Sequence, residues 1–201
     1  MLSQNKTNRL TFYIQPIQVM TKEYTKEQKL VNNQVYYQQW WGDEQYTPKH
    51  WVELLLPYIQ HLKDKIIWCP FDKEDSQFVL VLKDNWFKVV YSHLDYWQDF
   101  LTYEPEQRDV IISNPPYKNK RSFWERALDL WKPFALLLPT NILSDSVINV
   151  TMREREREFQ LLIPQKRMRF YNAKTGEVWN QPTFKASYFW VNIFERQIIL
   201  A

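Results

Sequence analysis

Short runs of apolar residues alternate with segments of helical spacing along most of the chain. Four runs of five or six residues, each bounded by polar or turn-forming residues, have the apolar character of buried strands. They span residues 65–69, 88–92, 109–113 and 134–139, and two further strands are expected at 161–163 and 186–194. Strands with such continuous apolar runs are typical of a parallel sheet that is covered on both faces.

Helical spacing occurs in the segments between these strands. Thr47 and Pro48 have the residue types of an N-cap and a first helical position, and apolar residues continue at helical spacing as far as Tyr58. Two more helices are predicted at 76–84 and 122–131. This alternation predicts an α/β fold with a mostly parallel sheet, in which ligands bind beyond the carboxyl ends of the strands.

The first 42 residues differ from the rest of the chain in composition, because they are rich in Gln, Tyr, Asn and Lys. Their pattern predicts one strand at 10–19 and one helix at 26–39. We therefore expect an N-terminal extension at 1–42 and a single domain at 43–201, which is long enough to bury one core. Further along, Arg and Glu alternate through residues 153–158, a pattern that favours a solvated helix face.

Composition excludes several classes of protein. The 201 residues are 45% hydrophobic and 17% aromatic, which excludes a disordered chain. The one cysteine, Cys69, excludes an internal disulfide, and the three histidines, His50, His61 and His93, have no metal-ligand spacing. No apolar stretch is long enough for a membrane span and the chain start lacks a signal-peptide core, so a soluble cytoplasmic protein is expected. The net charge of +3 is compatible with a polyanionic partner but does not require one.

The strongest chemical signal is the tetrapeptide Asn114-Pro115-Pro116-Tyr117, which directly follows the apolar run 109–113. An amide-like or exocyclic amine nitrogen is a poor nucleophile because its lone pair is delocalised. The side-chain oxygen of Asn114 and the carbonyl of Pro115 can accept its two N–H bonds and stabilise the positive charge that develops on it. The prolines hold these acceptors in place, and the Tyr117 ring can stack on a planar substrate. The motif indicates methyl transfer to nitrogen, although Asn and Pro also form ordinary turns.

Several segments around this motif follow the order of the motifs of one enzyme family. Over about residues 44–194 the chain resembles the S-adenosylmethionine-dependent amino-methyltransferases that make N6-methyladenine in DNA, in their gamma arrangement. The resemblance implies a Rossmann-like class I methyltransferase fold, S-adenosylmethionine as cofactor and the N6 amine of adenine as acceptor. Asn-Pro-Pro-Tyr is its strongly specific part. The run Trp-Cys-Pro-Phe-Asp at 68–72 is similar to that of phage-encoded methyltransferase-like proteins.

The resemblance also implies where the cofactor is bound. In the family, a Thr-Pro helix start faces the methionine end, and an acidic-Pro-Phe loop with two glycines follows the first strand. An acidic residue after the second strand holds the ribose, and an acidic-Phe pair brackets the adenine. This chain departs from the pattern at 73–76, where other residues replace the glycines, and Asp72 and Asp75 would engage the methionine part instead. The residues so assigned to the cofactor are Tyr46, Thr47, Pro48, Cys69, Pro70, Phe71, Asp72, Asp75, His93 or Asp95, Asp99 and Phe100.

Basic residues indicate which molecule carries the acceptor nitrogen. Lys118, Lys120 and Arg121 follow the Asn-Pro-Pro-Tyr motif, and three more basic residues occur in 166–169, so both groups could meet phosphates. Phe184 matches the family's aromatic residue that stacks on an extruded base, although an ordinary packed Phe fits the same pattern. These residues favour nucleic acid, and DNA in particular, as the partner.

Other substrates and roles stay open from the sequence. RNA adenine and the side-chain amide of a protein glutamine suit the same motif, and the missing glycines allow a degenerate fold that only binds nucleic acid or a protein. The family normally reads DNA with a separate recognition domain, and few residues follow the last predicted strand. We therefore expect weak sequence preference, recognition by residues 1–42 and the loops near 141–157, or recognition by a partner subunit or a second copy of the chain.

Overall fold

The computed structural model describes residues 45–169, 171–172, 185–194 and 196–201, which belong to one compact unit spanning residues 42–201. The extension predicted at 1–42, with its strand at 10–19 and its helix at 26–39, lies outside the described residues and stays a prediction. Within the described residues, no helix is both long enough and apolar enough to cross a membrane.

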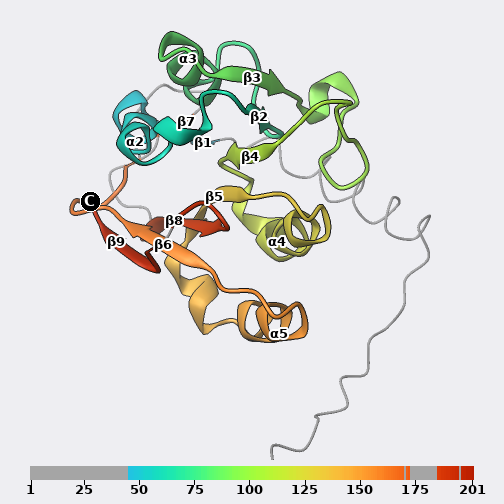
Figure 1. Ribbon diagram of the computed structural model, residues 1–201, viewed down its shortest axis with the longest axis vertical. Helices are drawn as coiled ribbons and strands as arrows, with labels where there is room; N and C mark the ends of the chain where they lie inside the picture. Colours follow the sequence, from blue (N-terminus) through green and yellow to red (C-terminus); the bar gives the residue numbers. More distant parts are fainter. Residues whose placement is uncertain (1–44, 170, 173–184, 195) are drawn as a thin grey trace, which may run out of the picture. The chain divides into compact units, whose positions relative to one another are not determined.

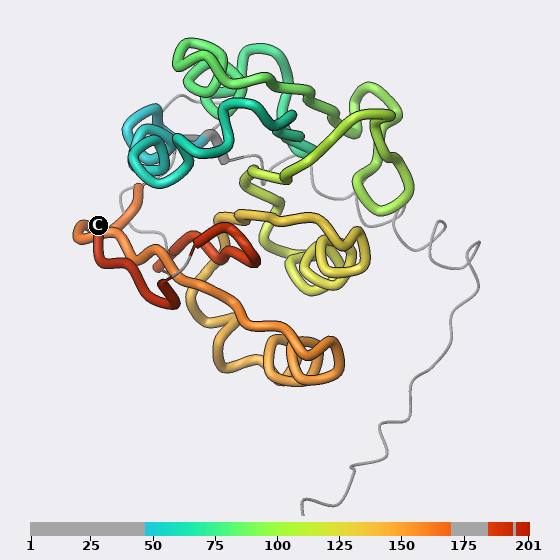
Figure 2. Tube along the Cα trace, in the orientation of Figure 1, coloured from blue at the N-terminus to red at the C-terminus, as the bar shows by residue number. Residues whose placement is uncertain are grey.

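A seven-stranded sheet forms the centre of this unit. Its strands are Ile66–Cys69 (β2), Lys88–Tyr91 (β3), Val110–Ser113 (β4), Phe134–Pro139 (β5), Gln160–Ile163 (β6), Ala186–Val191 (β8) and Ile198–Leu200 (β9). Their order in the sheet is β3-β2-β4-β5-β8-β6-β9 (Figure 1). The first four of these strands in the sheet are parallel neighbours and coincide with the four apolar runs of the sequence. β8 is antiparallel to both of its neighbours, and Figure 2 shows it returning between β5 and β6.

Helices cover both faces of the sheet, as the sequence predicted. They are Lys49–Glu53 (α2), Gln77–Asp84 (α3), Lys120–Asp129 (α4) and Ser146–Glu154 (α5). One core contains the buried residues of α2 and α3 together with Ile67, Val110 and Leu137 of the sheet. On the opposite face, the Trp124 ring of α4 lies edge-on to the Phe134 ring, with 5.2 Å between their centroids.

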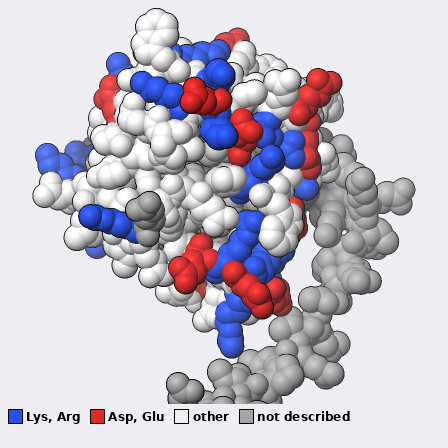
Figure 3. Space-filling view, viewed as in Figure 1, with Lys and Arg blue, Asp and Glu red and all other residues white. Residues whose placement is uncertain are grey.

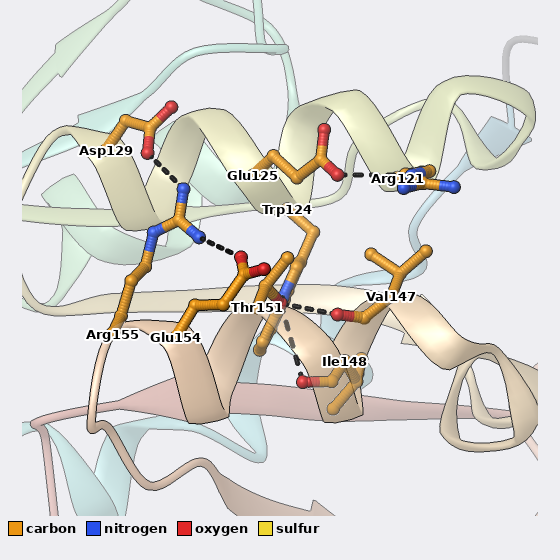
Figure 4. Close-up of polar contacts among 9 residues, drawn as sticks. All are labelled: Arg121, Trp124, Glu125, Asp129, Val147, Ile148, Thr151, Glu154 and Arg155. Carbon is orange, nitrogen blue, oxygen red and sulfur yellow. Dashed lines mark hydrogen bonds and ion pairs between the residues drawn. The ribbon is translucent and has the colours of Figure 1, made fainter. Parts of the chain in front are cut away.

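Helices α4 and α5 are joined by polar contacts as well as by packing (Figure 4). The indole nitrogen of Trp124 donates to the hydroxyl of Thr151 at 3.0 Å, and this hydroxyl donates to the Val147 carbonyl at 2.6 Å. Near the ends of both helices, the Arg155 guanidinium lies 2.5 Å from the Asp129 carboxylate. These bonds fix α5, an element that the sequence pattern did not predict.

The helix predicted from residue 48 to residue 58 is shorter in the structure. α2 ends at Glu53 and is followed by two 3-10 turns, Leu56–Tyr58 (η1) and Gln60–Leu62 (η2). A continued helix would place the Pro57 ring against the carbonyl of Glu53 and would lose one hydrogen bond. The predicted N-cap is also wrong, because Pro48 takes the cap position and no side chain caps the helix.

The run at 153–158 is largely exposed, as predicted, but only Arg153 and Glu154 belong to a helix, so the predicted helix face is wrong beyond them. α5 ends at Glu154, and the chain turns at Glu156 with a φ of 49°. The backbone N–H of Arg157 donates to the Met152 carbonyl at 3.0 Å, which closes the helix end. The Arg157 guanidinium then lies over the Trp131 ring at 4.3 Å from its centroid. Arg155 and Arg157 therefore anchor the helix end, while the other four residues of the run are exposed.

Candidate active site

The candidate site lies beyond the carboxyl ends of β2 and β4. The chain runs from β2 outward to β3 on one side of the sheet and then to β4 and β5 on the other. The carboxyl ends of β2 and β4 therefore flank the switch point of the sheet, where ligands of doubly wound folds bind. Asp72 follows β2 and Asn114 follows β4, so the two sequence segments with the clearest chemistry meet there.

Asn114 presents one free acceptor at this edge. Its side-chain nitrogen donates to Oγ1 of Thr47 at 3.0 Å. Its Oδ1 is buried and has no hydrogen-bond partner among the described residues. Pro115 is buried, and Pro116 has a φ of −56° at the start of the 3-10 turn Tyr117–Asn119 (η4). A buried acceptor without a partner costs free energy, so this atom is suited to receive an N–H from a ligand.

Thr47 reaches Asn114 because a small second sheet holds the chain before it. The strand Gln45–Tyr46 (β1), which contains the predicted cofactor residue Tyr46, pairs antiparallel with Tyr171–Asn172 (β7). Thr47 is buried, and so is Pro48. Thr47 thus acts as a hydrogen-bond acceptor for the side chain of Asn114 and not as a helix cap.

Asp72 is a buried carboxylate beside the same turn. Its Oδ2 accepts a hydrogen bond from the Ser113 hydroxyl at 2.5 Å, and its backbone N–H donates to the Ser92 carbonyl at 3.2 Å. Burial raises the pKa of Asp72 to about 6, while hydrogen bonds from Ser113 and Ser76 act in the opposite direction. The loop after β2 and the end of β4 are therefore joined through a titratable group.

The glycine-free loop after β2 adopts an ordinary backbone. No residue from 70 to 76 has a positive φ, so the glycines of the family are not needed for its conformation. Ser76 caps α3 by accepting the backbone N–H of Val79 at 3.3 Å, and Asp75 is exposed beside it. Cys69 and Pro70 are buried. Burial raises the pKa of the Cys69 thiol, and the nearby Asp72 carboxylate raises it further.

The aromatic residues assigned to the cofactor lie in one ring cluster. The Phe71 ring lies 4.9 Å from the Phe100 ring and 4.7 Å from the Phe123 ring, measured between centroids. The Trp68 ring contacts Phe100 from another side at 5.3 Å. Phe100 is 2% exposed, whereas Phe71 is only half-buried. Phe71 therefore offers more ring surface to a planar ligand than Phe100 does.

Polar contacts tie the loop after β2 to the loop after β3. The Lys73 ammonium lies 2.5 Å from the Asp95 carboxylate, and this bond lowers the pKa of Asp95. The backbone N–H of Asp95 donates to Nδ1 of His93 at 3.1 Å. Lys73 occupies the position of the first glycine in the family's loop. The carboxylate predicted to bind the ribose, Asp95, therefore has a cationic neighbour in this chain.

Asp99, the residue assigned to the cofactor adenine, is half-buried. Its Oδ1 accepts the backbone N–H of Leu101 at 3.0 Å. Burial raises the pKa of Asp99, against the opposing effects of this N–H and of the Arg126 charge. The carboxylate is thus held in a fixed orientation, which is what recognition of an exocyclic amine requires.

The basic residues after Asn114 have acidic neighbours. Lys120 lies 3.8 Å from the Asp145 carboxylate, and Nε of Arg121 lies 3.1 Å from the Glu125 carboxylate. Lys118 is exposed, and the face in Figure 3 shows Lys and Arg mixed with Asp and Glu. Exposed basic residues also follow the carboxyl end of β6, at Lys166, Arg167 and Arg169. The predicted base-stacking residue Phe184 lies outside the described residues.

Two polar residues of the site were missed by the sequence analysis. Ser113 directly precedes Asn114, and its position beside the motif was the only signal available. Tyr188 lies within the apolar strand β8, and its hydroxyl donates to the Trp51 carbonyl at 2.9 Å. Burial raises the pKa of Tyr188, as do its neighbours Tyr117 and Asp72. Among the described residues, no group of three His, Cys, Asp or Glu could hold a metal ion.

Comparisons with known proteins find similarity in structure only. No protein-family model matches the chain, and no curated protein matches its sequence. A Listeria monocytogenes protein described as a class I S-adenosylmethionine-dependent methyltransferase is 15% identical, with a TM-score of 0.44 over 88% of this chain and 79% of that one. A release-factor-specific protein-(glutamine-N5) methyltransferase from Alicyclobacillus acidocaldarius is 15% identical, with a TM-score of 0.39 over 69% of this chain and 88% of that one. A protein from Agrobacterium tumefaciens described as an O-methyltransferase is 12% identical, with a TM-score of 0.31 over 68% of this chain and 64% of that one.

The fold is that of the Rossmann-like class I methyltransferases, as the sequence predicted. Its defining features in this chain are the parallel order β3-β2-β4-β5 and the antiparallel β8 between β5 and β6. At the switch point, the buried Asn114 Oδ1 has no hydrogen-bond partner among the described residues.

Proposed function

We propose that this protein transfers a methyl group from S-adenosylmethionine to the N6 amine of adenine, in DNA. The observation that carries the proposal is the buried, unpartnered Oδ1 of Asn114 within an Asn-Pro-Pro-Tyr turn at the switch point of the sheet. Its amide is held by Thr47, so the acceptor is oriented before a substrate arrives.

The residues of this chain would act on the amine and on the cofactor at neighbouring strand ends. Asn114 Oδ1 and the Pro115 carbonyl would accept the two N–H bonds and stabilise the positive charge on nitrogen, whose proton can then leave to water. S-adenosylmethionine, when bound, supplies the electrophilic sulfonium methyl group. The loops after β2 and β3 would hold it, with Asp99 accepting its adenine amine and with His93 or Asp95 at its ribose. The conformation of residues 70–76, which has no positive φ, is compatible with this cofactor.

A protein glutamine amide is the second candidate acceptor. Its nitrogen has the same delocalised lone pair and the same two N–H bonds as adenine N6. The pairing of Lys120 and Arg121 with acidic side chains favours this candidate, because those cations are less available to phosphates. The exposed basic residues at 166–169 favour nucleic acid, and RNA adenine is suited as well as DNA. A partner subunit or a second copy of the chain would then supply sequence recognition.

The test is methyl transfer from radiolabelled S-adenosylmethionine to DNA, RNA and glutamine-containing peptides. Asn114→Ala should lower the single-turnover rate about a hundredfold or more, because one preorganised acceptor of the transition state is lost. The matched control is Asn119→Ala, since Asn119 lies in the same segment and its side chain caps nothing. Calorimetry should show unchanged S-adenosylmethionine affinity in both variants. Wild-type protein that binds the cofactor but methylates none of the substrates would support the degenerate fold that only binds.

A further inference from the structure

Asp72 and Ser113 form a buried link between the first loop of the sheet and the reacting turn. Oδ2 of Asp72 accepts the hydroxyl of Ser113 at 2.5 Å, and the two residues are 7% and 0% exposed. Ser113 is the last residue of β4 and is bonded covalently to Asn114. Asp72 is itself anchored on the neighbouring strand end, because its N–H donates to the Ser92 carbonyl.

We propose that Asp72 is a positioning residue, which holds the Ser113 hydroxyl and thereby sets the position of Asn114 Oδ1. The inference rests on the proposed function, because it assigns a role in the same reaction. Thr47 holds the Asn114 side chain from one side, and Asp72 holds its backbone through Ser113 from the other. An acceptor fixed at two points needs little reorganisation when charge develops on the substrate nitrogen.

The surroundings of Asp72 favour a functional role over a stabilising one. A buried carboxylate costs desolvation free energy, and here the Ser113 and Ser76 hydroxyls partly compensate it. The titratable groups that face it are Cys69 from β2 and Tyr188 from β8, and burial raises the pKa of both, so they stay neutral near pH 6. Ser76 faces it from the start of α3 and Ser113 from β4. An asparagine here would cost less to bury but would accept the Ser113 hydroxyl more weakly than a carboxylate does, so the charge strengthens the hold on Ser113 beside the site.

Single-turnover methyl transfer by Asp72→Asn, Ser113→Ala and the double variant tests the link. Each single variant should be about tenfold to a hundredfold slower at saturating cofactor, as expected for a displaced catalytic group. The double variant should be no slower than the slower single variant, because Asp72→Asn weakens and Ser113→Ala removes the same hydrogen bond. The wild-type rate should fall as pH drops through about 6, and Asp72→Asn should lack this dependence. Ser187→Ala is the matched control, since Ser187 is another buried strand serine at this edge and should keep the wild-type rate.

Two results would overturn the inference in an active protein: single variants within about twofold of wild type, or effects that add in the double variant. Inactivity of the wild type on every substrate would count against the proposed function and not against the link. In that case the inference is tested by NMR, in which the side-chain amide signals of Asn114 are followed as a function of pH in a proton–nitrogen spectrum. They should shift with a midpoint near pH 6 in wild type and stay constant in Ser113→Ala and Asp72→Asn. Constant signals in wild type would overturn the inference whatever the activity.

Discussion

The side-chain nitrogen of Asn114 lies 3.0 Å from the hydroxyl oxygen of Thr47, which is 67 residues earlier in the chain. This bond uses one N–H of the amide, whose oxygen is buried and has no partner among the described residues. Thr47 is in place because β1, just before it, pairs with β7. The orientation of the Asn114 amide therefore depends on a small sheet outside the seven-stranded one.

Thr47→Val should slow methyl transfer about tenfold at saturating cofactor. Valine keeps the shape of threonine but accepts no hydrogen bond, so the Asn114 amide loses the contact that fixes its orientation. Single-turnover rates measure the effect. Thr140→Val is the control, because the Thr140 hydroxyl bonds to the Lys185 carbonyl at 3.2 Å and not to Asn114. Equal rates for the two variants would show that the Thr47 bond does not orient the amide.

Asp72→Asn should raise the stability of the folded protein at neutral pH. The pKa of Asp72 is about 6 in the folded state, compared with 3.8 for an unperturbed Asp, so the folded state holds the proton more tightly. The free energy of unfolding of the wild type should therefore fall by roughly 3 kcal/mol as pH rises from about 4 to 6. Above pH 6 this group should cause no further change. Urea unfolding of both proteins at pH 4, 5, 6 and 7 measures the difference. A difference that is independent of pH would contradict the raised pKa.

The sequence predicted the strands well and the contacts of the site poorly, for physical reasons. A buried parallel strand must be apolar throughout, so β2, β4 and β5 are visible as short apolar runs. β1 and β7 have two residues each, and their pairing joins distant parts of the chain, so no local pattern marks them. The same holds for the Asp72–Ser113 bond, which spans 41 residues. The motif of Asn114 is local and therefore visible in the sequence, whereas its hydrogen-bond partner Thr47 was mistaken for a helix cap.

Trp86→Gly should stabilise the protein by about 1 kcal/mol. Trp86 follows the C-cap of α3 with a φ of 66°, a conformation that glycine adopts without steric cost. The bonds from Trp86 and Phe87 N–H to the carbonyls of Lys83 and Leu82, both 3.0 Å, need only the backbone, and the Trp86 side chain is 84% exposed. Urea unfolding measures the gain. Trp86→Ala is the control, because alanine keeps the Cβ atom, and an equal gain from both variants would rule out the backbone explanation.

Asp99→Asn should weaken S-adenosylmethionine binding by roughly 1 to 3 kcal/mol. Asparagine keeps an oxygen for the Leu101 N–H, so the local turn is preserved. Its amide nitrogen would replace the oxygen that accepts the adenine amine, which leaves two donors facing each other. Isothermal titration measures the affinity, and Asp129→Asn on the outside of α4 is the control. Unchanged affinity in Asp99→Asn would move the adenine site elsewhere.

Replacing Lys118, Lys120 and Arg121 together with alanine should weaken DNA binding equally for all sequences. Each lost phosphate contact should also lower the salt dependence of the binding constant by about one unit of slope. The ion pairs of Lys120 and Arg121 are surface pairs, which contribute little free energy, so phosphates can replace the carboxylates. The matched control removes the same charge from the opposite, amino-terminal edge of the sheet, at the exposed residues Lys63, Lys65 and Lys88. Equal slopes for the two triple variants would show that net charge alone attracts DNA, and the peptide glutamine would then become the favoured acceptor.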